Sequence, residues 1–251
     1  MVPKHVHMTW PTKEIVNSQA VLVNLGLRKL IDLNPDWTVT IHEDAEVNDY
    51  LEFHLGRNVW NVIRDDHIVT KTDLWRLIKL YEEGGVYCDI DRICDTPLDV
   101  VIPESVNWVL PTCLDHDFSQ DFMATAPGNP AFKLAADMYI ARRLNGQTNT
   151  YYLGPQTYMH AATRALTGHI IDSGCGPWVM GKLREHIASM PFMATYREQP
   201  PYNTILQRGD VDRSLTSYGK SDLPVGVETT HELAKRDLYK DFGMKHWTGE
   251  W

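Results

Sequence analysis

A helix pattern that runs through two glycines into a short acidic strand constrains this chain more than any other feature. Residues 71–91 read Lys-Thr-Asp-Leu-Trp-Arg-Leu-Ile-Lys-Leu-Tyr-Glu-Glu-Gly-Gly-Val-Tyr-Cys-Asp-Ile-Asp. The apolar residues that recur at i, i+3, i+4 and i+7, as on a buried helix face, are Leu74, Leu77, Ile78 and Tyr81. Gly84 is placed to cap this helix at its C-terminus. The pattern therefore predicts a packed helix followed at once by a strand.

The predicted strand ends on two carboxylates. Successive side chains of a strand point to opposite faces, so Tyr87, Asp89 and Asp91 are expected on one face, opposite Val86 and its apolar neighbours. Two carboxylates held side by side repel each other, and a hard divalent cation with oxygen ligands relieves that repulsion. The sequence predicts a metal site at Asp89 and Asp91.

The preceding helix carries a second polar group. Asp73 and Arg76 are three residues apart, so they lie on one side of the helix, with Thr72 immediately before them. Two interpretations stay open at this point. The two charged side chains either pair with each other or reach a ligand together.

Composition limits the classes of protein to consider. The chain has 251 residues, of which 43% are hydrophobic and 23% charged, and this is enough to bury one sizeable core. We expect a single domain over residues 1–251. The net charge of −9 argues against binding of duplex nucleic acid through its phosphates, although a nucleotide remains open as a small ligand.

The cysteines and the apolar stretches give an expectation for the compartment. The four cysteines lack the paired spacing of a zinc site and the density of a disulfide scaffold, which is typical of a reducing compartment. Residues 1–10 are not followed by the apolar run that a signal peptide requires. No apolar stretch approaches the roughly 20 residues of a membrane span. We expect a cytoplasmic protein with no membrane span.

Strand and helix patterns alternate along the first half of the chain, which predicts an α/β layer with a largely parallel sheet and ligands at the carboxyl ends of its strands. The expected strands are residues 3–10, 38–42, 86–91, 108–110, 122–126 and 192–196. The expected helices are residues 18–33, 44–55, 68–83, 130–144, 154–166 and 178–190. Residues 200–225 are polar and rich in turn formers, so we expect a loop over a site.

This pattern resembles a known family. Thr-Asp-x-x-Arg at 72–76, Gly-Gly-x-Tyr at 84–87 and Asp-x-Asp at 89–91 combine with the opening segment 2–10, the turn at 124–130 and the Gly-Pro pair at 154–155. Together they resemble glycosyltransferases with an Asp-x-Asp-containing sugar-binding region, such as α-1,6-mannosyltransferases and lactosylceramide α-galactosyltransferases. The glucosylating domain of the large clostridial toxins is more distantly similar. The resemblance covers most of the chain.

The resemblance implies a fold and an activity. The fold would be a single-domain, Rossmann-like glycosyltransferase fold of the GT-A type, with residues 1–100 binding the nucleotide sugar and residues 101–251 forming the acceptor side and a closing segment. The activity would be transfer of a hexose-type sugar, with retention of configuration, from a UDP- or GDP-linked donor to a glycan or other hydroxyl acceptor. Mn²⁺ or Mg²⁺ would be the cofactor. A bacterial or large-virus origin would fit a chain without a membrane anchor.

The family motif also implies roles for particular residues. Asp73 would accept hydrogen bonds from hydroxyls of the donor sugar, and Arg76 would bind sugar or phosphate oxygens. Trp10 would stack on the nucleobase unless it serves packing alone. The further residues expected around the nucleotide are His7, Thr9, Thr72, Tyr87, Asp89 and Trp251. The expected metal ligands are Asp89, Asp91, His246 and Glu250.

Two positions depart from the family pattern. Glu250 replaces a serine beside the terminal tryptophan, so it either ligates the metal or adds negative charge near a diphosphate. Asp121 stands where relatives often carry asparagine; it is a catalytic candidate, as nucleophile or oxocarbenium stabiliser, or an ordinary turn residue. His246 is a metal ligand or a surface histidine.

Two other classes of protein compete with the transferase interpretation. A metal-dependent phosphohydrolase or nucleotidyltransferase also uses paired acids, although it normally needs further carboxylates and a basic phosphate clamp. A non-catalytic nucleotide-sugar binding module would tolerate the change at Glu250. Binding and turnover of nucleotide sugars separate the three.

Overall fold

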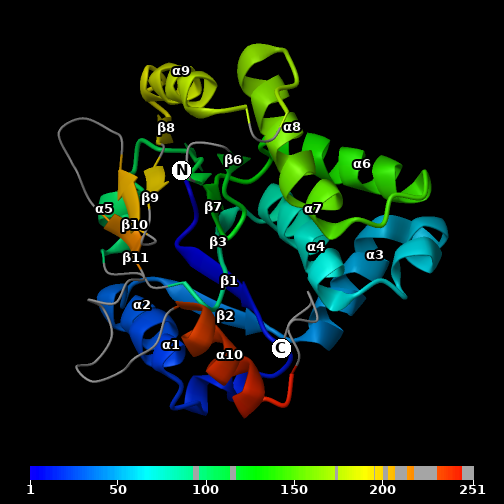
Figure 1. Cartoon of the computed structure of the whole chain (residues 1–251), viewed down its shortest axis with the longest axis vertical. Coiled ribbons are helices and arrows are strands. Elements are labelled where there is room, and N and C mark those ends of the chain that lie inside the picture. The colour runs from blue at the N-terminus through cyan, green and yellow to red at the C-terminus, as the bar shows by residue number, and fades with distance from the viewer. Residues whose placement is uncertain are drawn as a thin grey trace.

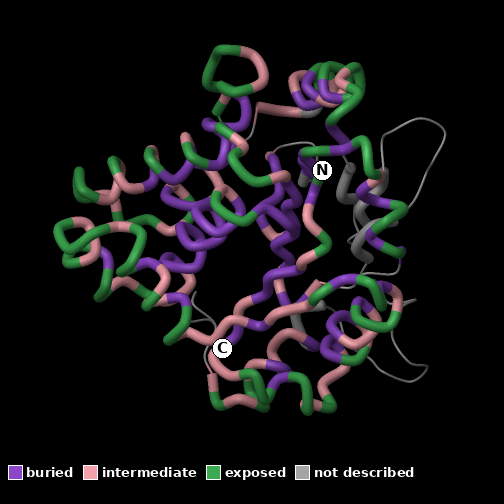
Figure 2. Tube along the Cα trace, turned by 180° about the vertical axis from the view of Figure 1, so that it is seen from behind, coloured by how far each residue is buried: buried purple, intermediate pink, exposed green. Residues whose placement is uncertain are grey.

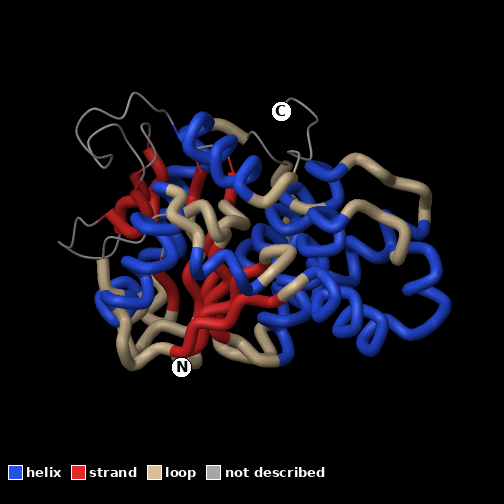
Figure 3. Tube along the Cα trace, turned by 90° about the horizontal axis from the view of Figure 1, so that it is seen from below, coloured by secondary structure: helices blue, strands red, loops and turns tan. Residues whose placement is uncertain are grey.

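A mixed α/β architecture surrounds a central sheet in the computed structural model, which describes residues 1–92, 96–113, 117–172, 175–194, 196–199, 203–206, 214–217 and 231–244. The sheet has the order β2-β1-β3-β7-β4-β8, and only the pairings of β7 are antiparallel (Figures 1 and 3). Its strands are β1 (His5–Thr9), β2 (Thr38–His42), β3 (Gly85–Cys88), β4 (Trp108–Val109), β7 (Phe122–Thr125) and β8 (Met193–Ala194). The predicted α/β class with a mostly parallel sheet is confirmed.

Helices cover both faces of this sheet (Figure 3). Those on one face are η1 (Lys13–Asn17), α1 (Val21–Val23), η2 (Asn24–Arg28), α2 (Lys29–Leu33), α5 (Leu98–Val101) and α10 (His231–Asp241). Those on the other are α3 (Asp44–Ile63), α4 (Ile68–Glu82), α6 (Pro130–Leu144), α7 (Thr150–Leu153), α8 (Pro155–Thr167) and α9 (Pro177–Ala188). No described helix is long and apolar enough to cross a membrane.

A second sheet runs β11-β10-β9-β5-β6. Its strands are β5 (Thr112–Cys113), β6 (Asp117–Phe118), β9 (Tyr196–Gln199), β10 (Asn203–Leu206) and β11 (Ser214–Ser217). The prediction of a loop over residues 200–225 is therefore wrong in part, because β10 and β11 lie within it. These strands satisfy their backbone groups by pairing with each other, which a polar composition alone does not indicate.

The central sheet separates two hydrophobic clusters, one on each of its faces. Val6, Met8 and Val86 point to one cluster, while Tyr87 and Met123 point to the other. The buried residues follow the strands and α4 through the centre of the molecule (Figure 2). Because side chains alternate between the two faces, the strands contribute residues to both hydrophobic clusters, as expected for a sheet covered on both faces.

The glycine pair between α4 and β3 is required by close backbone approaches. Gly84 has φ 68° and Gly85 has φ 93°, in the region that favours glycine. A Cβ atom on Gly85 would lie 2.5 Å from the carbonyl oxygen of His5, and one on Gly84 would lie 2.9 Å from that of Thr125. The Gly84 N–H donates to the Leu80 carbonyl at 3.0 Å, so its predicted role in ending the helix is confirmed.

The helix predicted from residue 18 begins later. Residues Lys13–Asn17 form a 3₁₀ turn, Ser18 accepts only the Ala20 N–H at its side chain, and the helix starts at Val21. It contains the π-helical segment Asn24–Arg28. A Cβ on Gly26 in this segment would lie 2.5 Å from the carbonyl oxygen of Arg92, so the π-helix packs directly against the backbone that follows the two acids.

Two other boundaries differ from expectation. The helix predicted to end near residue 55 continues to Ile63, with a break at Gly56, where φ is 68° and ψ is 159°. The strand predicted over 86–91 ends at Cys88. Beyond it the Asp89 N–H donates to the carbonyl of Asp121 at 2.8 Å and the Arg92 N–H donates to that of Asp89 at 3.1 Å, so the acids lie on a turn.

Candidate functional site

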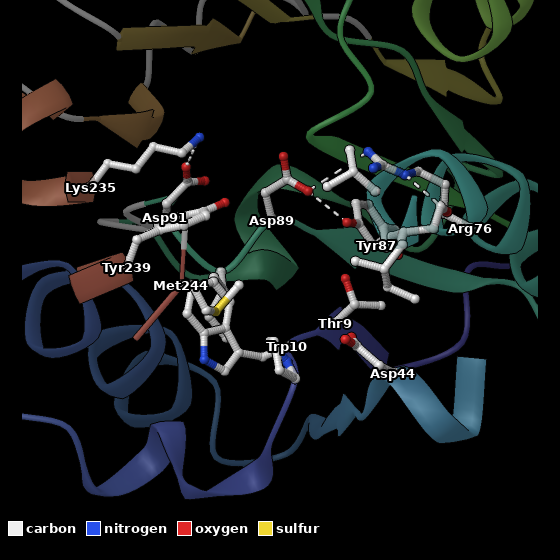
Figure 4. A pocket seen from close by; sticks show the side chains of 15 residues that line it. Thr9, Trp10, Asp44, Arg76, Tyr87, Asp89, Asp91, Lys235, Tyr239 and Met244 are labelled. Atoms are coloured by element: carbon white, nitrogen blue, oxygen red, sulfur yellow. Dashed lines mark hydrogen bonds and ion pairs between the residues drawn. The ribbon is translucent and has the colours of Figure 1, made fainter. Parts of the chain in front are cut away.

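A polar cleft opens where β1 and β3 end, between α4 on one side and α10 on the other (Figure 4). Its wall residues come from five separate segments of the chain. They are Thr9, Trp10, Pro11, Asp44, Ile68, Val69, Thr72, Arg76, Tyr87, Asp89, Ile90, Asp91, Lys235, Tyr239 and Met244. The carboxyl ends of parallel strands are the usual place for a ligand in an open α/β sheet, so the position agrees with the expectation from strand order.

The α4 wall is a buried network around Arg76. Its guanidinium lies 2.7 Å from the Asp73 carboxylate, donates to the Gln120 carbonyl at 2.8 Å and lies 3.7 Å from Asp89. The same group stacks over the ring of Tyr87 at 4.3 Å. Tyr87 in turn donates its hydroxyl to Asp89 at 2.6 Å. These contacts fix one acid of the motif against the fold (Figure 4).

Asp73 anchors Arg76 rather than lining the cleft. Both side chains are buried, and burial raises the pKa of Asp73 to about 6, an effect that the neighbouring Arg76 opposes. The backbone of Gly154, at the start of α8, is so close that a Cβ there would overlap the Asp73 carboxylate. The two side chains thus contact each other directly, and of the pair Arg76 lines the cleft.

The α10 wall faces the second acid. Lys235 lies with its ammonium 2.5 Å from the Asp91 carboxylate, and Asp91 raises the pKa of Lys235 although burial opposes that effect (Figure 4). One turn further, Tyr239 packs edge-on against the ring of Trp10 at 5.4 Å. Sequence reasoning missed Lys235 and Tyr239. The signal was the pair of apolar residues Ala234 and Leu238, four apart, which bury one face of α10 and leave the adjacent face for the cleft.

Asp44 is a further cleft residue that the sequence reasoning missed. It begins α3, directly after β2, and it faces the side of the cleft that holds Thr9 (Figure 4). Its side chain is half-buried, and burial raises its pKa. An acid that follows a strand at the carboxyl edge of the sheet is the signal that could have identified it.

Residues 21–108 match the family described as "Glycosyltransferase sugar-binding region containing DXD motif", a segment that includes α4, β3 and both acids. These residues belong to the DXD glycosyltransferase family. The family predicted from the sequence is thereby confirmed.

Curated relatives carry the same kind of name. The chain is 29% identical over 133 residues to "Inositol phosphoceramide mannosyltransferase 3" of Schizosaccharomyces pombe, covering 51% of this chain and 35% of that protein. It is 30% identical over 166 residues to "Inositol phosphoceramide mannosyltransferase 2" of the same organism, covering 63% and 43%. "Mannosyl phosphorylinositol ceramide synthase CSH1" of Saccharomyces cerevisiae is 24% identical over 161 residues, with 63% and 39% covered. The chain thus spans well under half the length of these relatives.

One solved structure has a partly similar path. The chain titled "PaToxG Glycosyltransferase" aligns with a TM-score of 0.47 and 19% identity, over 66% of this chain and 71% of that one.

Most of the residues that the DXD glycosyltransferase motif predicted around a nucleotide line the cleft. Thr9, Trp10, Thr72 and Tyr87 do so together with Arg76. The indole N–H of Trp10 is buried without a hydrogen-bond partner among the described residues, while its ring packs against Tyr239 and Phe242. Trp10 therefore packs in the core with its ring, and the residue also forms part of the cleft wall.

His7 is not brought to the cleft. It is fully buried on the opposite side of β1 from Trp10, with Nδ1 3.2 Å from Nε2 of His42, its ring 4.1 Å from that of His5, and an edge contact to Trp75. Burial lowers the pKa of His7 to about 3 and that of His42 to about 4. These contacts place His7 in the core. The strand reaches the cleft two residues later, at Thr9.

Asp121 also stands apart from the cleft lining. Its carboxylate pairs with Arg92 and accepts the Ser119 hydroxyl, and its backbone carbonyl accepts the Asp89 N–H. These contacts connect β7 to the turn that carries the acids. They favour the interpretation of Asp121 as a residue that holds this turn.

The carboxylates of the DXD motif offer oxygen ligands of the kind that Mg²⁺ or Mn²⁺ takes, and a magnesium ion is commonly held by one or two carboxylates together with substrate phosphates. Asp89 and Asp91 both line the cleft and fit this role. Within the described part of the chain, no group of three or more histidine, cysteine, aspartate or glutamate side chains is arranged to hold a metal. The other predicted contributors, His246, Glu250 and Trp251, lie outside the described residues.

Proposed function

We propose that this chain is a metal-dependent glycosyltransferase that moves a hexose-type sugar from a UDP- or GDP-linked donor to a hydroxyl acceptor such as a glycan. The observation that carries the proposal is a single cleft that combines Trp10, Arg76 and both acids of the DXD motif at the carboxyl edge of the sheet. An aromatic surface, a guanidinium and paired carboxylates are the groups that a base, a sugar phosphate and a metal-bound diphosphate require.

Each group has a task in such a reaction. Trp10 would contact the base through the part of its side chain that lines the cleft. Arg76, which Asp73 and Gln120 hold in place, would bind a sugar or phosphate oxygen as negative charge develops on the leaving group. A divalent cation at Asp89 and Asp91 would supply further charge stabilisation there.

Retention of configuration is part of the proposal. Among the described residues, those that line the cleft include no carboxylate besides Asp44, Asp89 and Asp91, and Asp121 is held by Arg92. This arrangement favours a reaction in which the leaving phosphate accepts the acceptor proton, without an enzyme nucleophile at Asp121. The printed names of the relatives make mannose the first sugar to test.

The test is a panel of UDP- and GDP-linked sugars, including a mannose donor, measured by calorimetry with and without Mn²⁺ and then assayed for sugar release. A transferase binds one donor in a metal-dependent way and releases free sugar and nucleoside diphosphate slowly when water replaces the acceptor. Asp91→Asn should abolish the metal-dependent part of binding, whereas Asp137→Asn, in an exposed pair with Lys133, should leave it unchanged.

Other results would assign the chain to a different class. Release of sugar phosphate and nucleoside monophosphate would indicate a phosphohydrolase. Donor binding with no turnover, even with hydroxyl acceptors present, would indicate a binding module. Absence of binding to every nucleotide sugar would overturn the proposal.

A further inference from the structure

Lys235 contacts Asp91, one of the two carboxylates that would ligate a metal in the cleft. Its ammonium lies 2.5 Å from Oδ2 of Asp91, and the two side chains are 21% and 10% exposed. Asp91 is the acid on the α10 side of the cleft, whereas Asp89 is held on the α4 side by Tyr87. The DXD motif is thus divided between two walls, and each wall brings its own cation (Figure 4).

The helix that carries Lys235 is anchored independently of this contact. Ala234 and Leu238 are buried in the core on the α1 side of the sheet, where α10 packs beside α1 (Figure 1). Tyr239 and Phe242 contact the ring of Trp10 edge-on. Since these contacts fix the helix axis, the long side chain of Lys235 can leave Asp91 by changing its own rotamers, without movement of α10.

We propose that Lys235 and a divalent cation compete for the Asp91 carboxylate, so that Lys235 keeps the second acid in place in the ligand-free protein and releases it when the metal binds. The inference rests on the proposed function, because it concerns the metal that a nucleotide-sugar donor would bring to the same cleft. It assigns Lys235 as a positioning residue that lowers metal affinity in the absence of donor.

The physical reason is mutual repulsion at short range. A Mg²⁺–oxygen bond is about 2.0–2.1 Å long, so an ammonium kept in hydrogen-bond contact with the same carboxylate would lie close to the ion. Two cations at that separation repel each other strongly in a partly buried site. Metal binding must therefore include the free-energy cost of breaking the Lys235–Asp91 pair, and by linkage the metal weakens that pair by the same amount.

The main experiment measures metal binding alone. Mn²⁺ and Mg²⁺ are titrated by calorimetry into the wild type, Lys235→Met and the matched control Lys240→Met, which removes the same charge from the exposed side of the same helix. Lys235→Met should bind Mn²⁺ on the order of tenfold more tightly than the wild type. Lys240→Met should match the wild type, and Lys235→Arg, which keeps the cation, should not gain affinity.

A second measurement uses the wild type and does not depend on how the variants fold. An amine-reactive reagent with detection by mass spectrometry reports the reactivity of Lys235, with Lys240 as the internal reference. Saturation with Mn²⁺ should increase labelling of Lys235 several-fold relative to Lys240.

Equal Mn²⁺ affinity in the wild type and Lys235→Met would overturn the competition, as would unchanged labelling of Lys235 at metal saturation. If neither protein bound Mn²⁺ or Mg²⁺, Lys235 would be a permanent counter-ion of Asp91 and the inference would be wrong. Because none of these measurements contains a nucleotide sugar, they can fail while donor binding and turnover succeed, and the reverse.

Discussion

The two walls of the cleft hold their acids in different ways. On the α4 side, Asp89 contacts a network in which Arg76 and Asp73 are both buried and each charged group has several partners. On the α10 side, Asp91 faces a lysine whose side chain keeps 21% of its surface exposed. The acids themselves run the other way, since the Asp89 side chain is 35% exposed and that of Asp91 is 10% exposed. The two cations therefore make the difference: Arg76, 8% exposed, belongs to the folded core, whereas the Lys235 side chain can change its rotamers when a ligand binds.

The difference between the walls can be tested by removing the cation from each wall in turn and comparing the losses of stability. Arg76→Met leaves the Asp73 carboxylate buried without its cation, so the free energy of unfolding should fall by about 3–5 kcal/mol. Lys235→Met removes a cation that is more exposed than Arg76, and a fall of about 1–2 kcal/mol is expected. Urea unfolding followed by circular dichroism measures both. Equal losses would show that the walls do not differ.

The packing of the π-helical segment against the turn that carries the acids can be tested at Gly26. Gly26→Ala places a Cβ 2.5 Å from the Arg92 carbonyl, so it should destabilise the fold by about 1–3 kcal/mol and weaken Mn²⁺ binding. The matched control is Gly181→Ala in α9, where nothing lies within 4 Å of the added Cβ. There alanine should stabilise by about 0.5–1 kcal/mol, because it replaces a glycine inside a helix. A neutral Gly26→Ala would contradict the packing.

Trp10 gives a further test of the α10 wall, because its ring packs against that wall and the residue also lines the cleft. Trp10→Phe keeps an aromatic ring against Tyr239 but deletes the indole N–H. Nucleotide affinity should fall by roughly 2- to 10-fold, because the smaller ring offers the base less surface, while Mn²⁺ affinity stays the same. Calorimetry with UDP, GDP and Mn²⁺ separates the two. Unchanged nucleotide affinity would assign Trp10 to packing alone.

A separate effect concerns acid stability and lies outside the cleft. The folded protein holds the pKa of His7 at about 3, below its ordinary 6.5, so between these values the unfolded chain binds the extra proton and stability rises with pH. His7→Gln should reduce that slope by up to about 1.4 kcal/mol per pH unit. Urea unfolding at several values from pH 4 to pH 7 measures it. An unaltered slope would mean that His7 is not buried as a neutral base.

The α4 wall could be predicted from the sequence because its residues are close together along the chain. The helix spacing, the glycine pair and the acids all lie within residues 71–91, and local pattern rules apply to such a segment. The extent of the strand was wrong, since the pattern does not reveal that Asp89 pairs its N–H with Asp121 from another strand. Pairing across 32 residues belongs to the tertiary structure.

The α10 wall could not be predicted in the same way. Lys235 meets Asp91, and Tyr239 meets Trp10, only after the chain has crossed both sheets. Nothing local distinguishes Lys235 from Lys240 on the same helix except the neighbouring buried residues Ala234 and Leu238. His7 shows a further limit of the resemblance, which implies a place at the nucleotide, whereas the structure buries the side chain two residues before Thr9 reaches the cleft.

The division of the acids has a consequence for the order in which ligands arrive. Among the described residues that line the cleft, Asp44, Asp89 and Asp91 outnumber the cations Arg76 and Lys235, and the whole chain carries a net charge of −9. The diphosphate of the proposed donor would therefore meet a repulsive field in this cleft, which would slow its association. A divalent cation would reverse the local sign, so the proposed function implies that the nucleotide is captured after the cation or together with it.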